Sequence, residues 1–349
     1  MDLDPVVCAL RECGVPLQQM AERNSLSMLH RAVALGRLDA LGELRGDVHT
    51  RDALGQTPLH YAVLLGSLDA VRDLLELGAD PNAADHTLNA YTPLHLACKA
   101  AWNDAVGELF RFRDLQVNKA SGRHGTALHL ALRVHAVQIA EKLVVAGGAD
   151  VNAADGTGLR PLHVLALELL CNGKSEELQK LLGLLCEARG AGELQVNAVD
   201  AEGRTPLHCA ALTGNRMVAE ALLTQLKADP HARDQLGRTP LHLAVLGLCV
   251  GSDSGLGSSI KALLAAGAPL LARDRRGLTA LDTLKIVQRS RNWRKGEATA
   301  ISVAALQLTK AEEDVARAAQ AEAMAKELIA DEEQLASRKK PGTNKKTSG

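Results

Sequence analysis

A four-residue motif recurs along most of the chain, and its period constrains the fold more than any other feature. The start-to-start spacings of its copies are 30, 35, 34, 34, 45, 34 and 40 residues. Such a period indicates one supersecondary unit repeated in a stack, because a single short unit cannot bury its own apolar face. The copies are SMLH at 27–30, TPLH at 57–60, TPLH at 92–95, TALH at 126–129, RPLH at 160–163, TPLH at 205–208, TPLH at 239–242 and TALD at 279–282.

Each motif is followed by a pattern that predicts two short helices and a turn. The first apolar run, such as LHCAALTG, ends at a glycine (Gly36, Gly66 and Gly214) where a helix can stop in a left-handed conformation. The second run carries a pair of leucines or an equivalent pair. Between units an aspartate precedes a glycine by three positions, which predicts a turn whose carboxylate bonds nearby backbone N–H groups. These aspartates are Asp52, Asp155, Asp200, Asp234 and Asp274.

The units resemble the ankyrin repeat, a family with a period of about 33 residues and the signature T-P-L-H-x-A. The resemblance implies an all-α repeat solenoid, an ankyrin array of about eight helix-pair units with β-hairpin tips, followed here by a long C-terminal helix. We expect an N-terminal capping segment at 1–24, the ankyrin repeat domain at 25–300, an α-helical extension at 301–336 and a disordered basic tail at 337–349.

The motif itself predicts a helix start. Threonine suits the N-cap, and proline suits the first helical position because its missing N–H costs nothing there. The histidine three residues after the threonine can bond back to it with one ring nitrogen and reach the adjacent hairpin with the other. Zinc binding is disfavoured, since neighbouring units lie about 10 Å apart and zinc ligands lie about 2 Å from the metal. The histidines are His30, His60, His95, His129, His163, His208 and His242.

Motifs for catalysis or cofactor binding are absent from the sequence. It contains no GxxxxGK[ST], HExxH or GxSxG, and its seven cysteines form no CxxC pair. The net charge of −1 gives no global attraction to nucleic acid or membrane, and no apolar run reaches the roughly 18 residues of a membrane span. We therefore expect no enzyme activity, cofactor, metal or small-molecule substrate. Because the cysteines show no disulfide pattern, we also expect the protein in a reducing compartment, the cytosol and also the nucleus.

The resemblance implies a protein-binding scaffold or adaptor that uses its hairpin tips and concave helix face. The later tips are basic, and arginine is enriched in interface hot spots and binds carboxylates in a bidentate manner. This pattern suggests a partner with an acidic segment, and solvated turns are the alternative interpretation. The candidate contact residues are Tyr91, Arg160, Arg204, Arg233, Arg238, Arg273, Arg275 and Arg276.

Two other functions remain open at this point. One is a regulatory inhibitor or targeting subunit of an enzyme or transcription factor. The other is a substrate-recognition adaptor for protein degradation, although no ligase-binding box is recognisable.

Several segments depart from the regular unit. The 45-residue unit has a loop at 171–175, and the 40-residue unit contains GSDSGLGSS at 251–259. Both enlargements are compatible with partner contacts or with neutral length variation. RSRNWRK at 289–295 is interpreted as a loop whose tryptophan covers the end of the stack. Beyond it, an Ala, Glu and Lys-rich composition predicts a long helix that either caps the array or extends to a partner.

Overall fold

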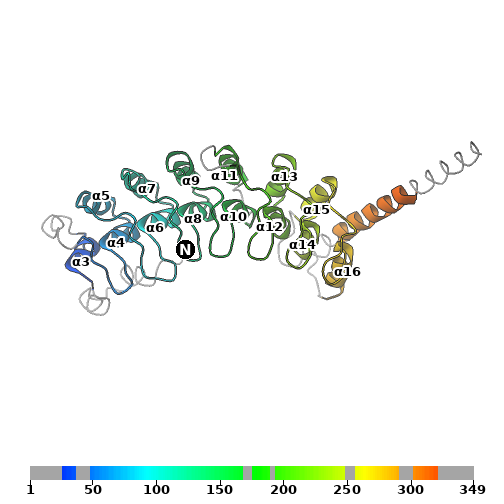
Figure 1. Ribbon diagram of the computed structural model, residues 1–349, viewed down its shortest axis with the longest axis horizontal. Coiled ribbons are helices and arrows are strands. Elements are labelled where there is room, and N and C mark those ends of the chain that lie inside the picture. The colour runs from blue at the N-terminus through cyan, green and yellow to red at the C-terminus, as the bar shows by residue number, and fades with distance from the viewer. Residues whose placement is uncertain are drawn as a thin grey trace, which may run out of the picture.

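A computed structural model of the chain places its helices in two rows (Figure 1). The structure describes residues 26–36, 48–167, 175–188, 193–247, 256–290 and 302–320. The inner row holds the helices that begin at the repeated motif, namely α3 (Met28–Ala34), α4 (Pro58–Leu65), α6 (Pro93–Lys99), α8 (Ala127–Arg133), α10 (Pro161–Leu167), α12 (Pro206–Thr213), α14 (Pro240–Gly247) and α16 (Ala280–Ser290). The outer row holds α5 (Leu68–Glu76), α7 (Asn103–Leu109), α9 (Val137–Glu141) with the π-helical turn η3 (Lys142–Ala146), α11 (Ser175–Glu187), α13 (Arg216–Thr224) and α15 (Leu256–Ala265).

The tips lie beside the inner row, and the outer row lies on the other side of it (Figure 1). The tips leave the inner row and project to one side of the array (Figure 1). Each inner helix packs on its neighbours, as α12 does on α10 and α14. The expected all-α repeat solenoid is therefore confirmed. In the described part of the chain, no helix is long and apolar enough to cross a membrane.

Capping residues decide where the inner helices begin and end. Thr92 is in an extended conformation at the N-cap of α6, its hydroxyl accepts from the His95 N–H, and Pro93 follows at the first helical position. At the other end of an inner helix, Gly214 takes φ 69°. Ala101 and His135 occupy the corresponding place in two other units with φ of 53° and 56°. A left-handed residue thus ends the inner helix even where the sequence has no glycine.

Leucine and alanine supply most of the core, in keeping with the low aromatic content of the chain. Leu222 of α13 and Ala210 of α12 are fully buried between rows. Small alanines let short helices approach closely, so large rings are not needed to fill the space. Tyr61 is the largest fully buried side chain in the described residues, and its hydroxyl donates to Asp52 Oδ2 at 2.9 Å.

The tips are tight hairpin turns organised by the predicted aspartates. Asp200 Oδ1 accepts from the N–H groups of Glu202 and Arg204 at 2.9 and 2.8 Å, and its own N–H donates to the Arg204 carbonyl. Each of the other predicted aspartates likewise accepts from the backbone N–H groups two and four residues after it. The tips contain no extended strands within the described ranges, and the bridge between Ser121 and Gly125 is isolated.

Backbone hydrogen bonds join successive tips into one wall. The Gln235 N–H donates to the Glu202 carbonyl at 3.0 Å, and the Arg275 N–H donates to the Leu236 carbonyl at 2.9 Å. On the other side of the units, Asn118 Nδ2 donates to the Gly148 carbonyl while the Asp150 N–H donates to Asn118 Oδ1. These bonds cross from unit to unit, so each tip is tied to its neighbours.

A helix at 302–320 follows the array. Its first turns bury Ala304 and Leu308 in the core, whereas Val315 is 44% exposed, and the helix projects beyond the last units (Figure 1). The helix therefore covers the end of the array with its first turns and extends away with its later ones. The expected capping segment at 1–24, the Trp293 loop, most of both enlargement loops, residues 321–336 of the expected helical extension and the basic tail lie outside the described residues.

Replacing Gly203 by alanine should lower the free energy of unfolding by about 1–2 kcal/mol, the usual cost of a left-handed L-residue. Gly203 has φ +75°, and a Cβ built on it would lie 2.9 Å from the Gln235 nitrogen of the next tip. Gly183 within α11 is the control, because a Cβ there meets nothing within 4 Å and alanine favours helix. Urea denaturation of both variants checks the expectation, and equal effects at the two positions would contradict it.

Candidate partner-binding surface

The motif histidines each connect two units through their two ring nitrogens. His208 Nδ1 accepts from the Thr205 N–H at 3.1 Å, and His208 Nε2 lies 3.0 Å from the Arg238 carbonyl in the next unit. A backbone N–H can only donate, so Nδ1 is the acceptor and Nε2 carries the proton that it donates to the carbonyl. The carbonyls that receive these bonds along the array belong to Gln56, Tyr91, Leu159, Arg204, Arg238 and Leu278, at 3.0–3.1 Å.

Burial keeps these histidines neutral. It lowers the pKa of His60 and His95 to about 4 and lowers the pKa of His208 in the same direction. His95 differs from the others because its Nε2 has no hydrogen-bond partner in the described residues. There the Gly125 carbonyl of the next tip already accepts from the backbone and hydroxyl of Ser121, which stands where other tips have aspartate.

The predicted structural role of the histidines is confirmed by this geometry. Both ring nitrogens are engaged in most of them, so the imidazoles are not available as a shared set of ligands. Among the described residues, no group of three or more His, Cys, Asp or Glu side chains is placed to hold a metal ion. The surface left for function is therefore the wall of tips with the inner helices beside it, and the outer helix row.

Two of the candidate arginines are held by their own tips. Arg204 Nε donates to Asp200 Oδ2 at 2.8 Å, and Arg238 Nε donates to Asp234 Oδ2 at 2.7 Å. The arginine side chains are only 19% and 21% exposed, and the two carboxylates are almost fully buried. Charge reversal at either arginine would leave a buried, unpaired carboxylate, so it would test stability before it tested binding.

Three further arginines brace the hairpins. Arg233 donates to the Gly237 carbonyl of its own tip and to the Arg273 carbonyl of the next, at 3.2 and 2.8 Å. Arg273 donates to the Gly277 carbonyl at 2.7 Å, and Arg160 donates to the Asn152 carbonyl at 2.6 Å. Arg51, which the sequence analysis did not select, makes the same double contact as Arg233. Its signal in the sequence is the shared pattern of Arg-Asp with glycine three residues after the aspartate.

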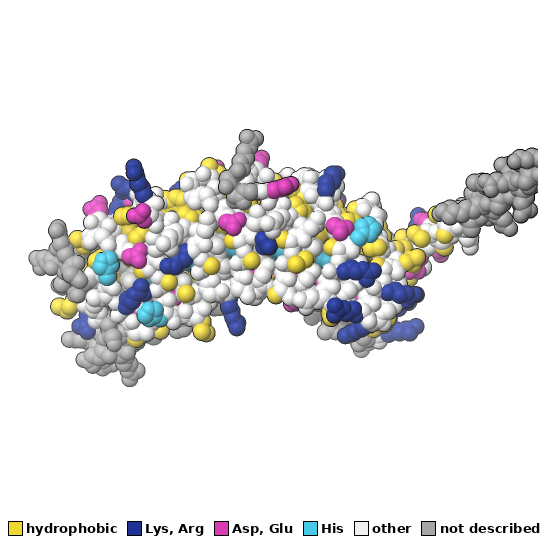
Figure 2. Space-filling view, viewed as in Figure 1, with side chains coloured by type: hydrophobic (Ala, Val, Ile, Leu, Met, Phe, Trp, Pro, Cys, Tyr) yellow, Lys and Arg dark blue, Asp and Glu magenta, His cyan; other side chains and the backbone are white. Residues whose placement is uncertain are grey.

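Arg275 and Arg276 differ from the other candidates because their side chains are exposed and make no hydrogen bond or ion pair within the described part of the chain. Figure 2 shows that Lys and Arg side chains gather at this end of the array. The arginines line a hollow of about 290 Å³ between the last two tips and the inner helices α14 and α16. The candidate arginines thus divide into those that brace a hairpin and those whose charge is free, a difference that the sequence analysis did not predict.

Tyr91 lies in the wall of tips with 6% of its surface exposed. Its ring stacks on His124 at a centroid distance of 5.8 Å, and Lys99 Nζ lies 5.5 Å from its centroid. Its carbonyl accepts the bond from His60. A partner at this tip would therefore meet the half-buried His124 and the exposed Lys99 around the ring before it met Tyr91 itself.

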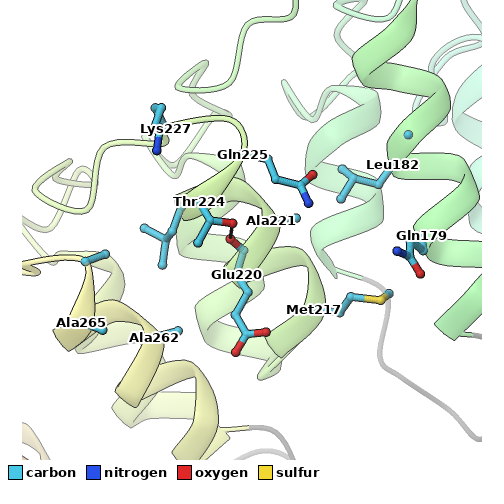
Figure 3. Close-up of a pocket in the computed structure, with 13 residues that line it drawn as sticks. Gln179, Leu182, Met217, Glu220, Ala221, Thr224, Gln225, Lys227, Ala262 and Ala265 are labelled. Atoms are coloured by element: carbon cyan, nitrogen blue, oxygen red, sulfur yellow. Dashed lines mark hydrogen bonds between the residues drawn. The ribbon is translucent and has the colours of Figure 1, made fainter.

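The outer row contains a larger hollow, of about 860 Å³, that the sequence analysis missed. In Figure 3, Gln179 and Leu182 of α11 lie opposite Met217 on α13, and Ala262 lines the hollow from α15. Apolar side chains and neutral amides share the lining, without a cluster of one charge. The sequence feature that accompanies this hollow is the length of the units around it. α11 and α15 belong to the units of 45 and 40 residues, which lie on either side of the regular unit that contains α13.

Comparison with known proteins identifies ankyrin repeats in this chain. The family model described as "Ankyrin repeats (3 copies)" matches residues 3–85, 136–234 and 162–274. NF-kappa-B inhibitor alpha of Sus scrofa is 34% identical over 138 residues, which cover 37% of this chain and 43% of that protein. ANK repeat-containing protein nipk-1 of Caenorhabditis elegans is 32% identical over 150 residues, which cover 37% of this chain and 24% of that protein.

The chain thus spans less than half the length of these curated relatives. Among solved structures, an ankyrin repeat domain from Acinetobacter baumannii is 21% identical. It has a TM-score of 0.49 and covers 63% of this chain and 97% of its own.

Replacing His208 by alanine should lower the free energy of unfolding by about 1–3 kcal/mol, since two or three hydrogen bonds of about 1 kcal/mol each are lost. His231→Ala is the control, because His231 is an exposed tip residue. Thermal unfolding with added zinc or with a chelator should give the same melting temperature for the wild type. A zinc-dependent shift that His208→Ala abolishes would instead indicate a metal site.

The protein should also lose stability as the pH falls from about 7.5 to about 5.5. The folded-state pKa of His60 is depressed from 6.5 to about 4, so the unfolded chain takes up protons in this range while the folded chain does not. Stability is fully present above the unfolded pKa and is lost on acidification, by about 1 kcal/mol for this one histidine. Urea midpoints at both pH values measure the change. His60→Gln should reduce the pH dependence, because it removes this titrating group, and an unchanged pH dependence would contradict the expectation.

Proposed function

Because the chain belongs to the ankyrin repeat family, whose repeats mediate protein–protein interaction, we propose that it is a non-catalytic scaffold or adaptor for a partner protein. The partner binds the wall of hairpin tips and the concave face of the inner helices. The observation that carries the proposal is that histidine bridges and tip-to-tip backbone bonds hold this surface rigid. A rigid surface loses little conformational entropy when it binds, so modest contacts from several units can add up to useful affinity.

The charge on the tips supports a partner with an acidic segment. Arg275 and Arg276 project freely from the last tip, and Lys285 and Arg289 are exposed on the neighbouring α16. A carboxylate that reaches these side chains gains charge-assisted hydrogen bonds, and the complementary fields speed the encounter. Nucleic acid is the less favoured partner, because the whole chain has a net charge of −1.

A reducing compartment, the cytosol or nucleus, is the proposed location. Cys98 and Cys209 are free thiols inside the core, and burial raises the pKa of Cys209 to about 12. Such thiols behave as small apolar side chains and not as nucleophiles.

A regulatory role is a second candidate, favoured by the similarity to NF-kappa-B inhibitor alpha. In that case the chain binds an enzyme or transcription factor and changes its activity or location. Titration of the purified chain into the partner's activity assay separates this role from passive scaffolding, because a scaffold leaves the activity unchanged.

The proposal is tested by affinity purification with the full chain as bait, followed by hydrogen–deuterium exchange on the purified complex. We expect a stoichiometric protein partner, and slower exchange in the tips and inner helices such as α12 and α14. Exchange in outer helices such as α5 and α7 serves as the internal control. Protection confined to the outer row, or a chain that retains no stoichiometric protein, would contradict the proposal.

A further inference from the structure

We propose that the last two tips and the inner helices beside them form a docking site for a short acidic segment that carries one large apolar side chain. We call this site the terminal corner and define it by Leu236, Arg275, Arg276, Leu278 and Ile286. All five residues line the hollow of about 290 Å³ described above. The inference rests on the proposed function and names the partner chemistry and the part of the surface that it contacts.

The terminal corner exposes large aliphatic side chains beside free cations. Leu236 is 50% exposed on its tip, and Ile286 is 51% exposed on α16. Both line the same hollow, Leu236 from a tip and Ile286 from α16, together with the half-buried Leu278. A leucine-sized side chain placed between them would remove apolar surface of both partners from water, which favours binding roughly in proportion to the area.

The cations of the corner are positioned by the backbone of the turn. The Arg275 N–H donates to the Leu236 carbonyl of the preceding tip. The side chain of Arg275 packs next to Gly237, since a Cβ added to Gly237 would lie 3.3 Å from Arg275 Cγ. The Arg276 N–H bonds Asp274 Oδ1. Both side chains therefore start from an ordered turn, and their guanidinium groups extend from it into solvent.

The remaining charges at the corner leave it positive. Arg238 lines the hollow but pairs with Asp234 Oδ2. Asp274 also lines it, and its Oδ1 accepts from the N–H groups of Arg276 and Leu278. His242 in the same wall is neutral, because burial lowers its pKa, and its Nε2 donates to the Leu278 carbonyl. Among the described residues that line the hollow, Arg275 and Arg276 are the cations without an ion pair, so an incoming ligand can supply the carboxylates.

The combination selects a peptide over a nucleic acid. Single-stranded nucleic acids bind through aromatic side chains on which their bases stack, and the terminal corner has aliphatic side chains instead. A peptide with carboxylates on both sides of a leucine matches both features. It can place the leucine between Leu236 and Ile286 while its acidic side chains reach Arg275 and Arg276.

The test uses a fluorescein-labelled peptide, GSEELEEGS, and fluorescence anisotropy with the full chain at low salt. The wild type should bind it, and Arg275→Glu with Arg276→Glu should weaken binding by about tenfold or more, as expected for lost charge-assisted hydrogen bonds. Ile286→Ala should weaken it by about threefold or more, since a contact of the leucine is lost. Added salt should reduce the affinity of the wild type strongly.

The matched control is Arg113→Glu with Lys180→Glu, which makes the same charge change at exposed residues of earlier units that lie outside the tips. It should bind within about twofold of the wild type. The peptide GSEEAEEGS should bind more weakly than the leucine peptide, and a labelled oligo-dT should bind more weakly than both. Circular dichroism verifies that each variant is folded, and binding is compared only among variants with the wild-type spectrum.

Three results would overturn the inference: no binding of the leucine peptide by the wild type, equal losses in the two double variants, or tighter binding of oligo-dT. The proposed function fails separately. If the wild type retains a partner protein with protected tips, and the Arg275→Glu, Arg276→Glu variant retains it equally, the scaffold stands and the terminal corner is not its contact. If the peptide binds as expected but no partner protein is retained, the peptide-binding role of the terminal corner is supported and the proposed scaffold function is contradicted.

Discussion

The hydrogen bond from a buried, neutral histidine to the next unit's carbonyl is the interaction on which the rest of the structure depends. This bond is made inside the protein, where an unpaired donor or acceptor would be costly. The other ring nitrogen of the same histidine accepts from the N-cap threonine and completes the cap of an inner helix. One side chain thus couples the start of a helix to the position of the following tip. Because the same bridge recurs along the array, the tips are held in one regular arrangement. The side chains exposed on these tips then determine what the surface can bind.

In the tips that have an aspartate, its spacing from a nearby arginine decides whether that arginine pairs with it or remains exposed. Where arginine stands four residues after the aspartate, as Arg204 and Arg238 do, the carboxylate's second oxygen binds it and the charge is neutralised. In the last tip that position is Leu278, and the arginines follow the aspartate directly. Their side chains cannot make the same pair, so they remain in solvent. A shift of two or three positions along one turn converts a brace into a candidate contact.

Much of this could be predicted from the sequence, because it depends on local chemistry repeated many times. The caps, the helix-ending glycines and the aspartate turns depend on residues close together in sequence, whereas the second bond of each histidine reaches a carbonyl one period further along the chain. The candidate surface could be predicted only in part. The arginines were grouped together because the pairing of Arg204 and Arg238 with their tip aspartates was not anticipated, and Tyr91 looks like an exposed tip residue, yet neighbouring units bury its ring. The hollow on the outer row required knowing how α11, α13 and α15 pack across unit boundaries.

The sequence by itself therefore determined the repeat, its capping chemistry and the hydrogen-bonding role of the histidines, since a side chain and its partner lie in one motif or one period apart. Tertiary structure alone decided which cations are free, which hollows exist and how the helix at 302–320 meets the array. These properties depend on contacts between units, where a difference of one turn position or a few residues of helix length changes what each surface exposes. The physical reason is that hydrogen bonding within a turn is short in range, whereas exposure is set by everything that packs around the side chain.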